Sequence, residues 1–293
     1  MQKRRAITIL EALVVIVICV CALGLAVMLI ARHRENAQRM QCTLNLKVMG
    51  DAFHAYHTVS SPDEARRYLP PSRIADGYAT WGALIAPYLA KDHALAKWDT
   101  QISYFAQTED VRQARLIYFF CPSRSRTDTL SQFGDLDGAK AHFPGGLGDY
   151  ANVAGDGFGD WTSPKANAAL VSADGIERKG ERIVNWHSMT GLASLPRGTA
   201  YTMLVGEKHV PIDRQGDAEV GDGSFYNGQN PASYSRVAGP GFPIAPSVTS
   251  PFNRNFGSYH HGICNFLMAD TSVRTMTFQT SEAVLGQLAR RTE

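Results

Sequence analysis

The sequence predicts an α+β protein in which a long N-terminal helix, first transmembrane and then amphipathic, packs on an antiparallel β-sheet head with loop-rich insertions. Three observations predict this class. An uncharged apolar run lies near the N-terminus, and a helical apolar stripe follows it without a proline. Short segments that alternate apolar and polar residues then recur near the C-terminus, between turns rich in glycine, proline and asparagine.

The apolar run covers residues 12–31, 20 residues with neither a charge nor a proline. At about 1.5 Å per residue it spans roughly 30 Å, the thickness of a hydrocarbon core. A secretory signal peptide has a shorter apolar region and a small-x-small cleavage site, and "VMLIARHRE" offers no such site. The run therefore predicts a membrane-retained helix. Basic residues flank both of its ends, so the positive-inside rule does not fix its orientation.

The helix is expected to continue past the membrane, because no proline occurs before Pro62. Apolar residues recur at spacings of four, three, four and three, which is the stripe of an amphipathic helix lying on a core. The sequence thus predicts one helix over about 7–57, roughly 75 Å long at 1.5 Å per residue. The stripe consists of Cys42, Leu46, Met49, Phe53 and Tyr56.

The remainder of the chain has the composition of one globular head. The whole chain holds 29 basic and 27 acidic residues, and residues 1–39 account for six and two of them, which leaves 23 and 25 in the head. A net charge of −2 without a basic cluster argues against nucleic-acid binding, which needs phosphate neutralisation. Glycine, proline and aromatic residues are frequent, as in a turn-rich domain that contains β-structure.

Within the head, alternation and flanking turns predict three strands, and apolar runs predict two helices. The region 154–195 shows neither pattern and is predicted to form long loops. The candidate strands are "AYTMLVGEKHV", "NFLMAD" and "VRTMTF", and the candidate helices are "WGALIAPYLA" and "SEAVLGQLARR".

The N-terminal stretch "RRAITILEALVVIVI" resembles the signature of type IV pilins and of the pseudopilins of type II secretion. In that family a prepilin peptidase removes a short basic leader, the new N-terminus is often methylated, and a glutamate stands at the fifth mature position. The resemblance implies cleavage between Ala6 and Ile7, although the family usually has glycine where this chain has Ala6. It also implies that Glu11, which costs about 2.5–3.5 kcal/mol to insert into a bilayer, pairs with the terminal amine of a neighbouring subunit during assembly.

The head resembles a multi-copy family of pilin-signature proteins abundant in planctomycetes, a domain of unknown function. That family ends in a motif of histidine, nine residues and Asp-Gly, which here runs from His260 to Asp270 with Thr271 in place of glycine. The resemblance implies a pilin-like fold. It rests on "QCTLNLKVMGDAFHAYHTV", "ATWGALIAPYLA", "YFFCPSRS", "DYANVAGDG", "GTAYTMLVGEKHV", "DGSFYNG" and "FGSYHHGICNFLMADTSVRTMT", in this order.

The two resemblances and the apolar pattern divide the chain into four parts. These are a prepilin-type leader at 1–6, a transmembrane helix at 7–31, the periplasmic half of the long helix at 32–60 and a globular α+β head at 61–293. The expected location is the inner (cytoplasmic) membrane, crossed once, with the N-terminus cytoplasmic and the head periplasmic or otherwise extracytoplasmic.

The motif residues His260 and Asp270, together with His261, allow two interpretations, a metal or acid–base site and a hairpin turn. The intervening residues alternate like a strand, a turn and a second strand, which favours the turn, with Asp270 bonding its own backbone. Thr271 lacks the ease of glycine at positive φ, so its turn is expected to differ from the family's.

Metal-ligand patterns are sparse in this sequence. Asp149, Asp156 and Asp160 stand among glycines, where carboxylates could bind calcium as some major pseudopilins do, but their spacing fits no EF-hand loop. No cysteine spacing matches a zinc finger, so no metal cluster and no cofactor other than calcium is expected. His54 and His57 are interpreted as surface or capping residues.

Five cysteines are present. Cys19 and Cys21 lie in the membrane run and are interpreted as small apolar residues. The resemblance places cysteines at Cys42 and Cys121, and we expect a disulfide between them in an oxidising compartment. Cys264 stands where the family commonly has a small residue.

Three functional interpretations remain open at the level of the sequence. The first is a pilin-like or pseudopilin-like membrane-anchored subunit of a type II secretion or type IV pilus-like assembly, with other pilin-like subunits, prepilin peptidase and membrane lipid as partners. The second is a membrane-tethered binding module, for instance for glycans, in which exposed aromatic residues stack on sugars. The third is an enzyme that would depend on His260 or Asp270; this is the least favoured interpretation and an enzyme is not expected, since no GxSxG elbow occurs. The aromatic candidates are Trp81, Trp98, Trp161, Tyr226 and Tyr234.

Overall fold

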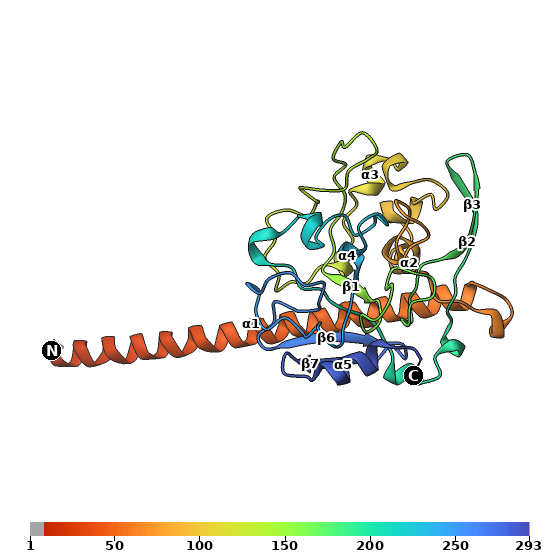
Figure 1. Cartoon of the computed structure of the whole chain (residues 1–293). Coiled ribbons are helices and arrows are strands. Elements are labelled where there is room, and N and C mark those ends of the chain that lie inside the picture. The colour runs from red at the N-terminus through yellow and green to blue at the C-terminus, as the bar shows by residue number, and fades with distance from the viewer. Residues whose placement is uncertain (1–8, 293) are drawn as a thin grey trace.

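The structure, a computed structural model, describes residues 9–292 and confirms the long N-terminal helix. Helix α1 runs unbroken over Ile9–Val59, 51 residues, and its first half projects away from the head (Figure 1). Residues 9–34 are all exposed, and the most apolar window of this helix has a mean hydropathy of 3.3. It is one helix long and apolar enough to cross a membrane, as the composition predicted.

The second half of α1 packs against helix α2 (Trp81–Leu89) and the hairpin of strands β6 (Ile263–Met268) and β7 (Val273–Thr277). The predicted stripe is confirmed, because Cys42, Leu46, Met49 and Phe53 are buried. A β-carbon on Gly50 would lie 2.9 Å from a methyl carbon of Leu267, so glycine lets the helix approach β6 closely.

The head is built on a five-stranded sheet of order β5-β1-β4-β6-β7. Its other strands are β1 (Tyr150–Val153), β4 (Met203–Glu207) and β5 (Ser235–Arg236). The three predicted strands correspond to β4, β6 and β7, which pair antiparallel. The sheet is nevertheless mixed, since β1 pairs antiparallel with β4 but parallel with β5. Strands of two and four residues are too short to produce a recognisable alternation.

The expectation of loops throughout 154–195 was wrong in part. This region contains a two-stranded antiparallel sheet of β2 (Asp174–Lys179) and β3 (Arg182–His187), which stands out from the body of the head (Figure 1). Most of its side chains are exposed, so it lacks the apolar face that makes a half-buried strand visible in a sequence.

Both predicted helices of the head are present as α2 and α5 (Glu282–Ala289), and two single-turn helices are added, α3 (Glu109–Arg112) and α4 (Pro231–Tyr234). The Ser281 side chain caps α5 by accepting a hydrogen bond from the Val284 N–H. Strand β6 divides the core, because Leu267 faces the cluster around α1 and α2 whereas Phe266 and Met268 face the cluster beneath α5.

The β6–β7 hairpin confirms the turn interpretation of the C-terminal motif. Asp270 Oδ1 accepts hydrogen bonds from the backbone N–H and the hydroxyl of Ser272, at 3.0 and 2.6 Å. Thr271 itself adopts φ +68° in this turn, a left-handed conformation that favours glycine, so the absence of glycine did not prevent a positive φ here. The hairpin geometry thus outweighs the backbone preference of threonine.

Candidate functional site

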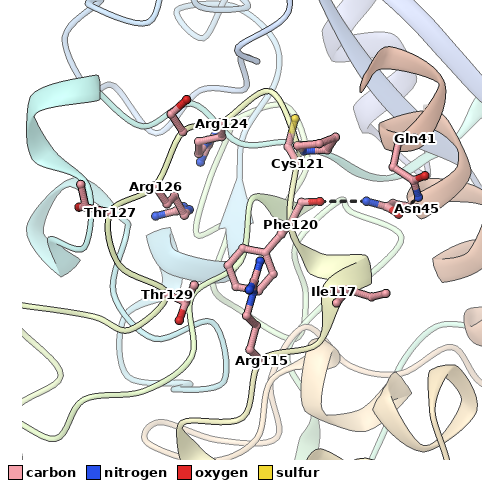
Figure 2. A pocket seen from close by; sticks show the side chains of 12 residues that line it. Gln41, Asn45, Arg115, Ile117, Phe120, Cys121, Arg124, Arg126, Thr127 and Thr129 are labelled. Atoms are coloured by element: carbon pink, nitrogen blue, oxygen red, sulfur yellow. Dashed lines mark hydrogen bonds between the residues drawn. The ribbon is translucent and has the colours of Figure 1, made fainter. Parts of the chain in front are cut away.

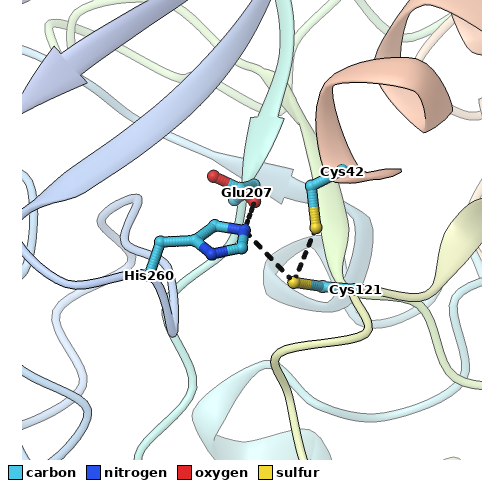
Figure 3. Close-up of side chains that lie close together, drawn as sticks. All are labelled: Cys42, Cys121, Glu207 and His260. Atoms are coloured by element: carbon cyan, nitrogen blue, oxygen red, sulfur yellow. Dashed lines mark hydrogen bonds and ion pairs between the residues drawn. The ribbon is translucent and has the colours of Figure 1, made fainter. Parts of the chain in front are cut away.

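Four ionisable side chains from distant parts of the chain meet beneath α1 (Figure 3). Cys42 comes from α1, Cys121 from the loop after a short 3₁₀ turn, Glu207 from the end of β4 and His260 from the loop before β6. One ligand-type atom of each lies within 4.8 Å of the others, and all four residues are buried. The individual separations are 2.8 Å between the two sulfurs, 3.7 Å from Cys121 Sγ to His260 Nε2 and 3.3 Å from His260 Nε2 to Glu207 Oε1.

Backbone contacts hold the two cysteines in place. Cys42 lies on the buried face of α1, where the neighbouring Asn45 side-chain amide donates to the Phe120 carbonyl at 2.9 Å. The N–H of Cys121 donates to Asp149 Oδ2 at 2.7 Å, which fixes the loop that carries the second sulfur. The loop is therefore tied to α1 through Asn45 and to the residue before β1 through Asp149.

Polar contacts also fix the orientation of the Glu207 and His260 side chains. Glu207 Oε2 accepts the Asn265 N–H at 2.7 Å, while the buried Oε1 forms an ion pair with His260 Nε2 at 3.3 Å. On the far side of the imidazole, His260 Nδ1 lies 3.2 Å from both Ser123 Oγ and Glu35 Oε1. Glu35 stands on α1 just outside the predicted membrane span, so the imidazole also links the head to that part of the helix.

The charges of the cluster follow from these contacts. Burial alone lowers the pKa of His260, but its hydrogen bonds to Cys121 and Glu207 outweigh burial and raise the pKa to about 10. The hydrogen bond from Cys42 lowers the pKa of the Cys121 thiol to about 7, and the same bond raises the pKa of Cys42. One thiol thus donates to the other sulfur, which favours a single thiolate at Cys121 opposite an imidazolium.

This arrangement supports two kinds of chemistry. Two sulfurs in contact can be oxidised to a disulfide, which would close a long loop between α1 and the head. Two thiolates, an imidazole and a carboxylate are also a ligand set that Zn²⁺ takes in proteins. The structure brings together the two cysteines between which we expected a disulfide, with both thiols free and the sulfurs 2.8 Å apart.

A cavity of about 720 Å³ opens beside Cys121 (Figure 2). Its basic side chains are Arg115, Arg124 and Arg126, and its other wall includes Gln41 and Asn45 of α1. Beneath it lies a buried ionic network that contains four cations and two anions. The members are Arg124, Arg126, Lys208 and Arg236 on one side, and Asp149 and Asp222 on the other.

The three calcium candidates do not meet. Asp149 pairs with Arg124 at 3.1 Å in that network, and Asp156 accepts from the Asn167 amide at 2.9 Å. Asp160 is exposed and accepts the Thr162 N–H at 2.9 Å. Within residues 9–292 they form no common cluster, and each carboxylate is occupied by a different protein group.

The motif residues His260 and Asp270 also lie apart, at opposite ends of β6. Asp270 belongs to the hairpin turn and His260 to the buried cluster. The proposed cleavage site between Ala6 and Ile7 lies outside the described residues, whereas Glu11 lies in the exposed first turn of α1.

The aromatic residues considered for sugar stacking are mostly in the core. Trp81, Trp98, Tyr226 and Tyr234 are buried, and only Trp161 is partly exposed. The four buried rings pack the head rather than face a ligand, for example through the edge-on contact of Trp81 with Phe225 at 4.9 Å.

The sequence did not single out Glu207, and it connected His260 with Asp270 rather than with the cysteines. A weak signal for Glu207 was available, since a charged residue that ends the otherwise uncharged "MLVGE" of a buried strand needs a partner inside the protein. Nothing in local periodicity connects it with residues 42, 121 and 260, because they belong to separate elements.

The fold and the apolar helix together define a membrane-anchored α+β module whose anchor and head share one helix. The chain belongs to the family described as a protein of unknown function, DUF1559, which matches residues 31–282, more than four-fifths of the sequence. Comparisons with curated proteins and with solved structures find no match.

Proposed function

We propose that the chain is a pilin-like subunit of a type II secretion or type IV pilus-like assembly. The observation that carries the proposal is the continuity of α1. A single helix exposes its uncharged apolar run, residues 12–31, at one end and buries its stripe in the head at the other. Such a subunit can remain in the membrane, or it can place its apolar half among the same helices of neighbouring subunits.

The apolar half of α1 can be covered either by membrane lipid or by the helices of neighbouring subunits. An apolar helix surface of this length is not stable in water, so lipid or other apolar helices must cover it. The N-terminal signature indicates the geometry of assembly. Pairing Glu11 with the amine of a neighbouring chain is a head-to-tail contact, which produces a helical filament rather than a closed ring. The head would then face the extracytoplasmic side of the inner membrane.

Two measurements test this proposal. The N-terminal peptide mass of the protein from its native membrane should correspond to a chain that starts at Ile7. In cells that make the filament, Glu11→Ala should remain in the membrane but disappear from the sheared filament fraction. Asp51→Ala is the matched control, since Asp51 is an exposed acid on the same helix within the head. An intact N-terminus, or filament incorporation of Glu11→Ala at the wild-type level, would contradict the proposal.

A second candidate function, a tethered binding module, is favoured by the cavity beside Cys121. Arginine forks suit carboxylate groups, and the buried Nε of Arg124 has no hydrogen-bond partner within residues 9–292. An acidic sugar such as a polyuronate would fit that lining better than a neutral one. Full-length protein in detergent should then bind polygalacturonate but not a neutral glucan, and Arg115→Ala should weaken the binding. Equal retention of both polymers argues against this function.

A further inference from the structure

The cluster of Cys42, Cys121, Glu207 and His260 has an arrangement that neither filament assembly nor sugar binding requires. Four ligand atoms of the kinds that bind transition metals converge on one point in the interior, from four separate segments. We propose that, with both sulfurs reduced, these four side chains form a closed binding site for one thiophilic divalent cation such as Zn²⁺.

Three distances between pairs of ligand atoms can be compared with those around a tetrahedral ion, and two of them fit. With Zn–S bonds of about 2.3 Å and Zn–N and Zn–O bonds of about 2.0–2.2 Å, neighbouring ligands should lie about 3.5 Å apart for S–N and about 3.4 Å for N–O. The corresponding separations here are 3.7 Å and 3.3 Å. The sulfur–sulfur edge of 2.8 Å is shorter than the tetrahedral value of about 3.8 Å, so one cysteine side chain must shift by roughly 1 Å.

The groups behind the four ligands are also arranged as in metal sites. Zinc-bound imidazoles usually engage a carboxylate or another oxygen through the second ring nitrogen. His260 meets this condition, because Nδ1 faces Glu35 Oε1 and Ser123 Oγ while Nε2 faces the sulfurs. Glu207 is oriented likewise, since Oε2 accepts the Asn265 N–H and leaves the buried Oε1 directed at the same point.

A disulfide is the competing use of the same sulfurs, and it explains less of the geometry. Bond formation between Cys42 and Cys121 would occupy the two sulfurs but would give no role to the buried Glu207–His260 pair that lies beside them, with Oε1 and Nε2 3.3 Å apart. A dication would be coordinated by that oxygen and by the imidazole as well. Because the four side chains would fill the four positions of a tetrahedral ion, no open position remains for a substrate, and the ion would be structural, fastening α1 to the head.

The experiment uses full-length protein in detergent, purified with reductant and stripped of metal. Titration with Co²⁺ should give one equivalent of binding, with a sulfur-to-cobalt charge-transfer band in the near ultraviolet and intense visible bands of tetrahedral Co²⁺. Zn²⁺ should then remove both bands by displacing the cobalt. Cys42→Ser and Cys121→Ser should each lose about half of the charge-transfer intensity, and Glu207→Gln should weaken Co²⁺ binding at least tenfold.

Cys264→Ser is the matched control. Cys264 is fully buried on β6 and its sulfur lies 3.5 Å from the Glu207 carbonyl oxygen, yet it is outside the ligand group. This variant should keep the wild-type cobalt spectrum, and far-ultraviolet circular dichroism should show that every variant is folded. Absence of the charge-transfer band in folded, reduced protein overturns the proposal, as does a spectrum that Cys42→Ser and Cys264→Ser alter equally.

A second readout concerns the protein as it occurs in the cell. Material from the native membrane should contain about one zinc per chain by elemental analysis, and Cys42 and Cys121 should become alkylated only after chelation. A Cys42–Cys121 disulfide without metal in that material would overturn the proposal. Neither result depends on whether the chain assembles into filaments, so the test is independent of the proposed function.

Discussion

Replacing Asp222 with asparagine removes an anion from the interior of the head without changing its volume. Asp222 is fully buried, and its carboxylate accepts hydrogen bonds from Arg126 at 2.6 and 2.9 Å and from the Gly216 N–H at 2.8 Å. The Lys208 ammonium lies 3.1 Å away on the other side. The amide of asparagine would leave Lys208 buried opposite a neutral group, whereas Arg126 would keep its pairing with Asp149.

The expected loss in the free energy of unfolding is large, because an unpaired buried cation cannot recover its hydration. Removing one partner of a buried ion pair typically costs about 3–5 kcal/mol. For a domain of this size each kcal/mol corresponds to roughly 2–4 °C, so the melting temperature should fall by about 10 °C.

The effect should also depend on pH. Burial disfavours the charged carboxylate, but Arg126 and Lys208 outweigh burial and hold the pKa of Asp222 well below its usual range. With a lowered native pKa, the stabilisation is complete above the unfolded-state value of about 3.9 and is lost as the pH falls towards the native value. The difference between Asp222→Asn and wild type should therefore be largest near neutral pH and shrink below about pH 4.

The assay is thermal unfolding of the full-length protein in detergent, followed by tryptophan fluorescence, at neutral and at acidic pH. Asp76→Asn is the control, because the Asp76 side chain is 71% exposed beside Arg73, and its loss should change stability by less than about 0.5 kcal/mol. The reasoning is refuted if Asp222→Asn melts at the temperature of the control near neutral pH, or if its deficit does not change with pH.

Two further predictions concern packing and the hairpin turn. Phe53 is fully buried on α1 and stacks on Trp81 with ring centroids 5.4 Å apart, so Phe53→Ala should reduce the free energy of unfolding by about 3–5 kcal/mol in denaturant titrations. Met40→Ala, at a residue 73% exposed on the same helix, is the comparison, and a similar loss there would contradict the packing argument. Thr271 has a left-handed backbone at φ +68°, and relief of that cost should make Thr271→Gly about 0.5–1 kcal/mol more stable. Thr271→Ala keeps the β-carbon and should show no comparable gain, so an equal gain would refute the explanation.

The sequence by itself determined the elements that carry a periodic pattern. The uncharged run at 12–31 and the stripe from Cys42 to Phe53 are properties of one helix, where residues three and four apart share a face. The strands β4, β6 and β7 and the helices α2 and α5 were equally visible, because each repeats its pattern over five residues or more. The turn at Asp270 followed from side-chain chemistry within three residues.

The cluster itself was decided only by tertiary structure. Cys42, Cys121, Glu207 and His260 lie in a helix, a loop, a strand end and a second loop, and no local rule connects these positions. The sequence also missed the parallel β1–β5 pairing, because the edge strand β5 has two residues. It missed the exposed β2–β3 hairpin because that hairpin has no buried face. Local patterns record which side of an element is apolar, whereas the packing of the whole chain decides which loops meet and which polar groups share the interior.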